Sequence, residues 1–437
     1  MEPLPSAYLS ALVPEDMDVR FYDDRMESIP YNEQTDLVLI SVETYTAKRA
    51  YQIASEYHRR GVRVFMGGYH ATLLTDEVLQ YADAVVVGEG EESVPVLMAD
   101  FKANRLKRIY SSSGANGLKT VSPDRRIFSG KRYLDIGLIE VTRGCRSHCE
   151  FCSITAFHRG KHSHRRIEML MKEIDTLKSS KKLFFFVDDN FTADVTFAKE
   201  FCRALIPLHI KWVGQASITL ALDGEMMSLM RASGCQGVLI GFESLNPQNL
   251  KAMNKRFNYT NIKYEEAIQR LNAYTLRLYA TFVFGYDYDV IDDFKRTLDF
   301  CVQHKIFMAA FNHLTPFPGT PVYEKLEKEG RLLYKKWWLD DRYRYGEVPF
   351  KTVIAPDVIK KECVKARKSF YGVPSIAKRM FNRSNCGNLL MFNAYWFINF
   401  LLRKEAEQRI DYPLGDLSFK GDLITVRDKE RENVLVA

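Results

Sequence analysis

The sequence has no cysteine before Cys145, and only three of its eight cysteines lie close together. The other five are scattered singly, which argues against a disulfide framework and favours a reducing compartment. The chain begins without the basic and then apolar pattern of a secretory signal. It also lacks an uninterrupted apolar run of 18 residues, the length that a spanning helix needs. We therefore expect a cytoplasmic protein without a transmembrane segment.

Low-complexity tracts and short internal repeats are also missing, so long disorder is not expected. The net charge of +7 is mild for 437 residues, and surface lysine explains it without a nucleic-acid partner. We expect no nucleic acid to bind. The length suits two domains and a further region, each able to bury its own core.

Three cysteines stand in the short stretch Cys145-Arg-Ser-His-Cys149-Glu-Phe-Cys152, after the apolar run 136–141 and a Thr-Arg-Gly turn. Thiolates with the spacing CxxxCxxC can reach three irons of a compact iron–sulfur cluster. A cluster that only carries electrons normally takes four cysteines. The fourth iron is then free for a small-molecule ligand, which indicates catalysis.

A zinc site is the alternative for these cysteines, because zinc accepts mixed sets of cysteine and histidine. Four nearby histidines could supply the fourth ligand: His148, His158, His162 and His164. Structural zinc ligands usually come in two separated pairs, whereas these thiols form one tight group. The grouping favours the cluster.

Residues 1–128 alternate between short β-branched runs and helical patterns, which predicts a doubly wound parallel sheet in a Rossmann-like domain. The predicted strands are 18–22, 37–41, 62–66 and 84–87, with a helix over 47–60. Ligands of such sheets bind at the carboxyl ends of the strands. Three loops there are small enough for close approach of a ligand: 41–44, 67–70 and 88–91. Residues 105–130 resemble a linker of turn-forming residues.

Residues 129–335 alternate in the same way and predict a partial (β/α)6 barrel, an open relative of the (β/α)8 barrel. Six strands are expected: 136–141, 183–187, 211–215, 237–240, 278–284 and 308–312. Polar residues follow several of them, at the rim where barrels carry their chemistry. These are Asp188, Asp189, Asn190, Gln215, Ser217, Glu243, Ser244, Asp287 and Asp289. Each aspartate or asparagine could instead cap the next helix.

Residues 336–437 predict a helical C-terminal region, with helices over 356–371 and 388–404. The second is short, very apolar and ends in Arg403 and Lys404. It is either a helix packed on the barrel or an interfacial helix that touches a membrane or a lipid-like substrate. The basic turn 157–166 is either solvated or holds a carboxylate or phosphate through Arg165 and Arg166.

The loop with Cys145, Cys149, Phe151 and Cys152 resembles the signature of the radical S-adenosylmethionine superfamily. The resemblance implies a 4Fe-4S cluster on the three cysteines. The open iron binds S-adenosylmethionine, which is cleaved to methionine and a 5′-deoxyadenosyl radical. The sequence Gly241-Phe-Glu-Ser244 is similar in kind to the superfamily motif that contacts the ribose. Contacts to S-adenosylmethionine or substrate are expected from Asp188, Asp189, Asn190, Gln215, Glu243 and Ser244.

The N-terminal loops resemble those of the cobalamin-binding-type domain found ahead of many such enzymes. That resemblance implies cobalamin contacts from Ser41, Gly67, Gly68, His70 and Gly88. Cobalamin domains that ligate cobalt carry an Asp-x-His-x-x-Gly motif. Here the corresponding place reads Asp23-Asp-Arg-Met-Glu-Ser28, without a histidine, so cobalamin is expected to bind without a lower protein ligand, or the domain binds nothing.

The resemblance predicts a radical enzyme that transfers a methyl group to an unactivated carbon or to phosphorus of a small-molecule or lipid-like substrate. It also implies an electron donor such as flavodoxin or ferredoxin. No side chain is assigned a catalytic role. The alternatives are a cobalamin-independent oxidoreductase or cyclase, a methylthiotransferase, and a non-catalytic metal module that binds nucleic acid. A methylthiotransferase normally needs a second cysteine triplet upstream, which this chain lacks.

Overall fold

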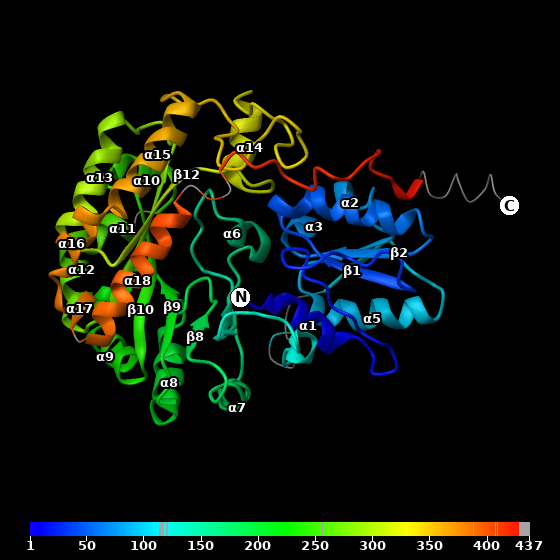
Figure 1. Cartoon of the computed structure of the whole chain (residues 1–437), viewed down its shortest axis with the longest axis horizontal. Coiled ribbons are helices and arrows are strands. Elements are labelled where there is room, and N and C mark those ends of the chain that lie inside the picture. Colours follow the sequence, from blue (N-terminus) through cyan, green and yellow to red (C-terminus); the bar gives the residue numbers. More distant parts are fainter. Residues whose placement is uncertain are drawn as a thin grey trace.

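The computed structural model describes residues 1–112, 118, 121–255, 257–387, 389–406, 408 and 410–427. Two α/β units lie side by side (Figure 1), the N-terminal one in blue and the larger one in green to yellow. The C-terminal segment runs back from the larger unit across the N-terminal one (Figure 1). The predicted α/β fold class, with a Rossmann-like unit followed by a partial barrel, is confirmed. The predicted domain limits 1–128, 129–335 and 336–437 stay predictions.

The N-terminal sheet is parallel, with strand order β1-β2-β3-β4. Residues that alternate along these strands pack on opposite faces, because successive side chains of a strand point to opposite sides. One face packs against α2, and the other packs against α1 and α5. The elements are α1 (Leu4–Leu12), β1 (Leu37–Ser41), η1 (Thr44–Thr46), α2 (Ala47–His58), β2 (Arg63–Gly67), α3 (Tyr69–Leu73), α4 (Thr75–Val78), β3 (Ala84–Val87), α5 (Gly90–Lys102) and β4 (Ile109–Ser111).

Two predictions for this unit were wrong. Residues 18–22 form no strand. Arg20 instead forms ion pairs with Asp18 and Glu33 at the surface. The sheet takes its fourth strand, β4, from the segment 105–130 that was predicted to be a linker, and η3 (Arg125–Phe128) follows there. Part of that segment, residues 113–117, 119 and 120, lies outside the described residues.

The larger unit carries a six-stranded parallel sheet in the order β12-β11-β10-β9-β8-β5. Its strands are β5 (Ile136–Ile139), β8 (Leu183–Phe186), β9 (Trp212–Ala216), β10 (Cys235–Glu243), β11 (Arg277–Phe284) and β12 (Met308–His313). A short antiparallel pair, β6 (Thr142–Arg143) and β7 (Ser163–His164), brackets the cysteine loop. The helices are α6 (Ser153–His158), α7 (Ile167–Leu177), α8 (Val195–Leu205), η4 (Ile206–Leu208), η5 (Ile218–Leu222), α9 (Gly224–Ala232), α10 (Pro247–Ala252), α11 (Phe257–Thr260), α12 (Tyr264–Ala273), α13 (Ile291–Gln303) and α14 (Pro321–Lys328).

The C-terminal helices cover the outer side of this sheet (Figure 1). They are α15 (Pro356–Phe370), α16 (Val373–Met380), α17 (Arg383–Cys386) and α18 (Leu389–Glu405). Both predicted helices of this region are therefore present, although Asn388 lies outside the described residues. Within the described ranges, no helix has the length and hydropathy that crossing a membrane would require.

Two features tie the units together. Trp337 and Trp338, which follow the barrel, are fully buried in the core of the N-terminal unit. The segment 410–427, here called the strap, returns to the N-terminal unit, where Gln52 hydrogen-bonds the backbone of Asp416 at 2.7 and 3.0 Å. The edge where the N-terminal strands end therefore faces the barrel.

Candidate functional site

The cysteine loop connects β6 to α6 on the rim where the barrel strands end. Its backbone folds tightly, with the Cys152 amide donating to the Cys149 carbonyl at 3.2 Å and the Ser147 amide to the Cys145 sulfur at 3.5 Å. Burial raises the pKa of Cys149 to about 12. Lys255 opposes this shift, and the charges of Cys152 and Cys145 add to it. The three thiols therefore lie on one short, tightly folded loop.

Neighbouring segments hold the loop from outside. Glu150 donates its amide to the Met253 carbonyl and accepts from the Val322 amide, both at 3.2 Å. The Asn254 side chain donates to the His148 carbonyl at 2.7 Å. Segments that follow α10 and begin α14 therefore hold the loop in place.

The predicted polar group after β8 supports the cysteine loop. Asp188 is fully buried and accepts from the amides of Val141, at 2.8 Å, and Thr142. Asp189 accepts from the Gly144 amide at 2.8 Å, and the Asn190 side chain donates to the Cys145 sulfur at 3.9 Å. Burial raises the pKa of Asp188 to about 8 and that of Asp189 to about 6. These residues orient the turn before the cysteine loop.

The predicted residues after β10 lie on the other side of the loop. Glu243 has a left-handed backbone (φ 63°) and pairs with buried Lys255, whose ammonium also donates to the Gly241 carbonyl at 3.2 Å. Burial acts to lower the pKa of Lys255, but the Glu243 carboxylate and the thiolates outweigh it, so the pKa is raised. Ser244 accepts from the Asn246 amide at 3.0 Å, and Gln215 is half-buried on β9.

Two of the four histidines that could complete a zinc site make other contacts. Among the described residues, no three or more His, Cys, Asp or Glu side chains are placed to hold a single metal ion, and this includes the three cysteines. His164 stacks on Phe197 with ring centroids 4.0 Å apart, and His158 approaches the Tyr69 hydroxyl at 3.4 Å. In the basic turn, Arg165 is fully buried and pairs with Glu173 at 2.6 Å.

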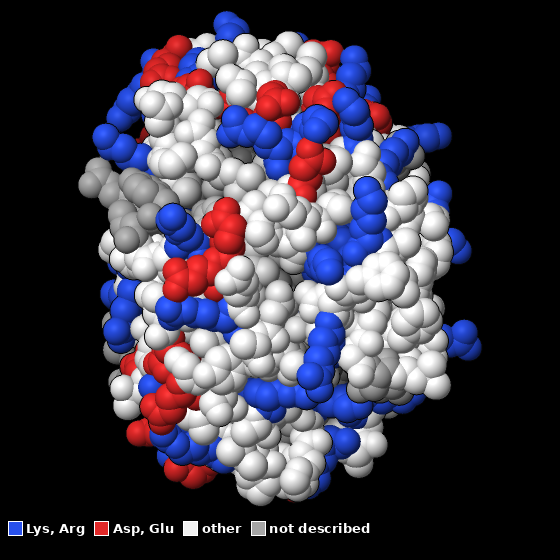
Figure 2. Space-filling view, turned by 90° about the vertical axis from the view of Figure 1, so that its left-hand side faces the viewer, with Lys and Arg blue, Asp and Glu red and all other residues white. Residues whose placement is uncertain are grey.

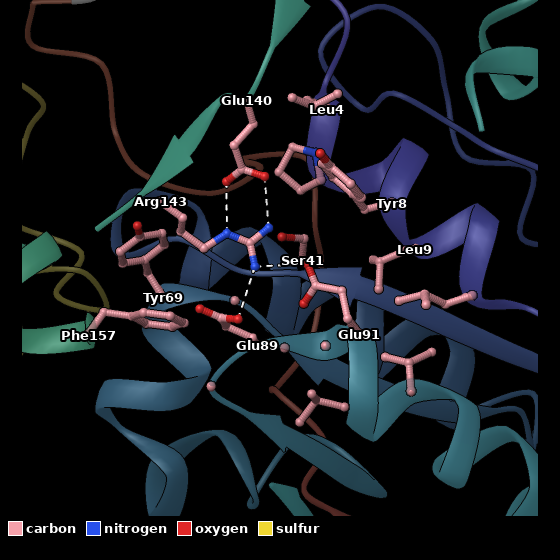
Figure 3. Close-up of a pocket in the computed structure, with 18 of the residues that line it drawn as sticks. Leu4, Tyr8, Leu9, Ser41, Tyr69, Glu89, Glu91, Glu140, Arg143 and Phe157 are labelled. Carbon is pink, nitrogen blue, oxygen red and sulfur yellow. Dashed lines mark hydrogen bonds and ion pairs between the residues drawn. The ribbon is translucent and has the colours of Figure 1, made fainter. Parts of the chain in front are cut away.

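A cavity of about 290 Å³ lies between the carboxyl ends of β1 to β3 and the barrel (Figure 3). Leu4, Tyr8 and Leu9 of α1 line one side, and Tyr69 and Phe157 line the other (Figure 3). Five of the predicted residues line it: Ser41, Gly67, Gly68, Gly88 and Asp189. Because Asp189 also holds the turn before Cys145, the cavity and the cysteine loop share one wall.

Arg143 is the main polar group of this cavity. Its guanidinium forms a two-bond pair with Glu140 at 2.8 Å and reaches Glu91 at 2.8 Å and Glu89 at 3.4 Å (Figure 3). Burial raises the pKa of Glu89, against the opposing charge of Arg143. The sequence did not single out Arg143, and its place directly before the cysteine loop was the only available signal.

The glycines at the strand ends make the cavity floor. Gly68 has φ 99°, and a Cβ there would lie 2.9 Å from the Val42 carbonyl oxygen. A flat, bulky ligand fits such a floor with apolar walls, because backbone can approach it closely. His70 is separated from these residues. It is buried beside Thr44, Tyr51 and Glu77, with contacts of 3.2 to 3.3 Å.

Two protein-family models match the chain. The B12 binding domain matches residues 1–98, and the Radical SAM superfamily matches residues 139–301. The chain is 31% identical to bacteriochlorophyllide d C-12(1)-methyltransferase of Chlorobaculum tepidum, over 92% of this chain and 88% of the relative. It is 29% identical to bacteriochlorophyllide d C-8(2)-methyltransferase of the same organism, over 75% and 77%.

A solved structure shares the fold. The methyltransferase TsrM from Kitasatospora setae, with cobalamin and a 4Fe-4S cluster bound, superimposes with a TM-score of 0.57 at 16% identity. The match covers 76% of this chain and 72% of that chain.

Proposed function

Because the chain belongs to the radical S-adenosylmethionine methyltransferases that carry a B12-binding domain, we propose that it methylates a carbon of a bacteriochlorophyllide-like tetrapyrrole. The enzyme uses a 4Fe-4S cluster, S-adenosylmethionine and cobalamin. The substrate is inferred from two relatives, both named for methylation of bacteriochlorophyllide d. The observation that carries the proposal is the wall shared by the cavity and the cysteine loop.

The residues of the chain have distinct proposed roles. Cys145, Cys149 and Cys152 hold three irons, and Glu243, Ser244 and Gln215 face S-adenosylmethionine. Ser41, Gly67, Gly68 and Gly88 contact the corrin, whose apolar ring suits the walls of the cavity. Asp188, Asp189 and Asn190 position the ligand loop. When bound, the cluster would supply the electron that cleaves S-adenosylmethionine, and cobalamin would supply a transferable methyl group.

Substitution of a cluster ligand tests the assignment. We expect Cys149→Ala to lose the iron–sulfur absorbance and the formation of 5′-deoxyadenosine. Cys386→Ala is the matched control, because Cys386 is a half-buried thiol outside the site. Cleavage of S-adenosylmethionine by anaerobically reconstituted Cys149→Ala protein would refute the role of this cysteine.

The electron donor is a second proposal. Arg146 is exposed beside the cysteine loop, and Arg159 and Lys161 are exposed after α6. A flavodoxin or ferredoxin with an acidic surface complements these charges. Reduction of the cluster by such a donor should slow at high salt and in Arg146→Glu, and a rate that does not respond to either change would contradict this docking site.

Contact with a membrane is a third proposal, and it concerns α18. Five of its large apolar side chains are exposed, and Arg403 and Lys404 follow in its last turn. They are Leu389, Phe392, Phe397, Phe400 and Leu401. On the face shown in Figure 2, leaving aside its upper part, the right-hand half carries Lys and Arg among uncharged residues. Asp and Glu lie mainly on the left-hand half. An apolar face with basic ends suits the surface of an anionic bilayer.

Vesicle sedimentation tests the membrane proposal. Protein should pellet with vesicles that contain phosphatidylglycerol, and Phe397→Glu should remain in the supernatant. Val353→Glu is the control, because Val353 is 71% exposed but lies outside α18. Equal sedimentation of both variants and the unsubstituted protein would contradict a role for α18.

A further inference from the structure

A second cavity, of about 340 Å³, opens at the carboxyl ends of β11 and β12. Its walls are part apolar and part polar, and its lining reaches the cysteine loop at Phe151 and the N-terminal unit at Tyr45. The other apolar residues in its lining are Val283, Leu314, Phe317 and Ile410. The cavity thus lies beside the proposed cluster, and it is distinct from the one that the glycine loops form.

The start of the strap and the segment around Tyr345 form one wall of this second cavity. Tyr345 and Ile410 line it, and the chain segments that carry them pair in antiparallel fashion. The Tyr345 amide donates to the Tyr412 carbonyl at 2.8 Å, and the Asp411 amide donates to the Tyr345 carbonyl at 2.9 Å. Lys360 of α15 pairs with the Asp411 side chain. The wall is therefore held by backbone hydrogen bonds and an ion pair.

Two basic side chains stand at the polar end of the cavity. Arg367 of α15 donates through Nε to the Cys363 carbonyl at 3.4 Å, and within the described ranges no Asp or Glu pairs with it. The Nε2 atom of His313 is buried, and no hydrogen-bond partner for it is present in the described part of the chain. Burial, followed by the charge of Arg367, lowers the pKa of His313 to about 4, so the imidazole is neutral at pH 7.

Arg367 differs in this respect from three other arginines of the barrel. Arg143, Arg165 and Arg331 each pair with at least one carboxylate at 2.6 to 2.8 Å. Arg367 is half-buried, and its guanidinium keeps donors that no carboxylate of the described chain occupies. A planar, bidentate ligand such as a carboxylate matches the geometry of this group.

We propose that Arg367 is a positioning residue that binds a carboxylate of the substrate, whose apolar body then lies along the cavity toward Phe151. This inference rests on the proposed function, and it narrows the substrate class to an apolar molecule that carries an acidic side chain. No bond is made or broken at this subsite.

The test compares a chlorin that carries a free propionate with its methyl ester, under methylation conditions, in three variants. Arg367→Gln should raise KM for the acid by between about tenfold and a hundredfold, the usual loss for a charge-assisted pair, with kcat little changed. The ester should not respond to this substitution. Arg367→Lys should restore part of the loss. Lys365→Gln is the control, because Lys365 is 70% exposed on the same helix.

Each outcome separates this inference from the proposed function. If the unsubstituted enzyme methylates acid and ester equally well, the carboxylate subsite is refuted and the proposed function stands. If it methylates neither, the tetrapyrrole substrate is refuted. Binding of the two chlorins, followed by their visible absorbance, then decides the subsite. The subsite is supported if the acid binds more tightly than the ester and Arg367→Gln abolishes this difference. It is overturned if the acid and the ester bind equally well.

Discussion

Asp188 shows how a buried carboxyl group serves the cysteine loop at the level of a single residue. Its pKa of about 8 lies above the unfolded value near 3.9, so the native state keeps a proton that the unfolded chain releases. Such a group lowers stability as pH rises from about 4 to about 8, by up to about 1.4 kcal/mol per pH unit.

We therefore expect the melting temperature of Asp188→Asn, measured relative to that of the unsubstituted protein, to rise when the pH is raised from 5.5 to 8.5. The amide cannot ionise, and its oxygen can still accept from the Val141 and Thr142 amides. Differential scanning fluorimetry of both proteins across this pH range measures the difference. A difference that stays constant with pH would show that Asp188 titrates normally.

The sequence predicted which polar residues lie at the rim, but it did not predict which groups they contact. Asp188 to Asn190 were predicted to face a ligand, and this stays a prediction. In the structure two of these side chains turn toward backbone amides before the cysteine loop, and Asp189 also lines the first cavity. Lys255 and Arg143 were missed. The role of Lys255 depends on its pair with Glu243, and that of Arg143 depends on a cavity between the two units. A local sequence pattern indicates neither contact.

At the level of elements, the turn between β2 and α3 depends on a glycine. We expect Gly68→Ala to reduce the amount of corrin that copurifies or binds, because a Cβ meets the Val42 carbonyl and φ is positive. The strain costs about 1–3 kcal/mol. Gly61→Ala is the control, since φ there is 73° but no atom lies within 4 Å of the added Cβ. Equal corrin absorbance in both variants would exclude close approach at Gly68.

Strands with β-branched or aromatic runs were predicted close to their observed limits, because burial on both faces leaves a strong sequence signal. The prediction of strands failed where a segment is polar or the strand is short. Residues 18–22 alternate charged and apolar residues but find no neighbouring strand, and β4 spans only three residues within a turn-rich segment. Helix α1 was not predicted, although it lines the corrin cavity.

At the level of the whole molecule, the barrel and the N-terminal unit share the core around Trp338. Its ring is buried, and its Nε1 donates to Glu77 at 2.8 Å. We expect Trp338→Ala to lower the free energy of unfolding by about 3–5 kcal/mol, because the substitution leaves a large buried cavity. Thermal melts with half-buried Trp396→Ala as control check this, and similar melting temperatures for both variants would contradict a shared core.

The most direct test of methyl transfer to the substrate uses S-adenosylmethionine that carries a deuterated methyl group. The reconstituted protein receives it with cobalamin, a reductant and a bacteriochlorophyllide, and the products are resolved by mass spectrometry. If the protein is a methyltransferase, the substrate carries the deuterated methyl group, and 5′-deoxyadenosine and S-adenosylhomocysteine are formed as well. Formation of 5′-deoxyadenosine and an altered substrate without the label would contradict methyl transfer, because the enzyme would then be an oxidoreductase or cyclase.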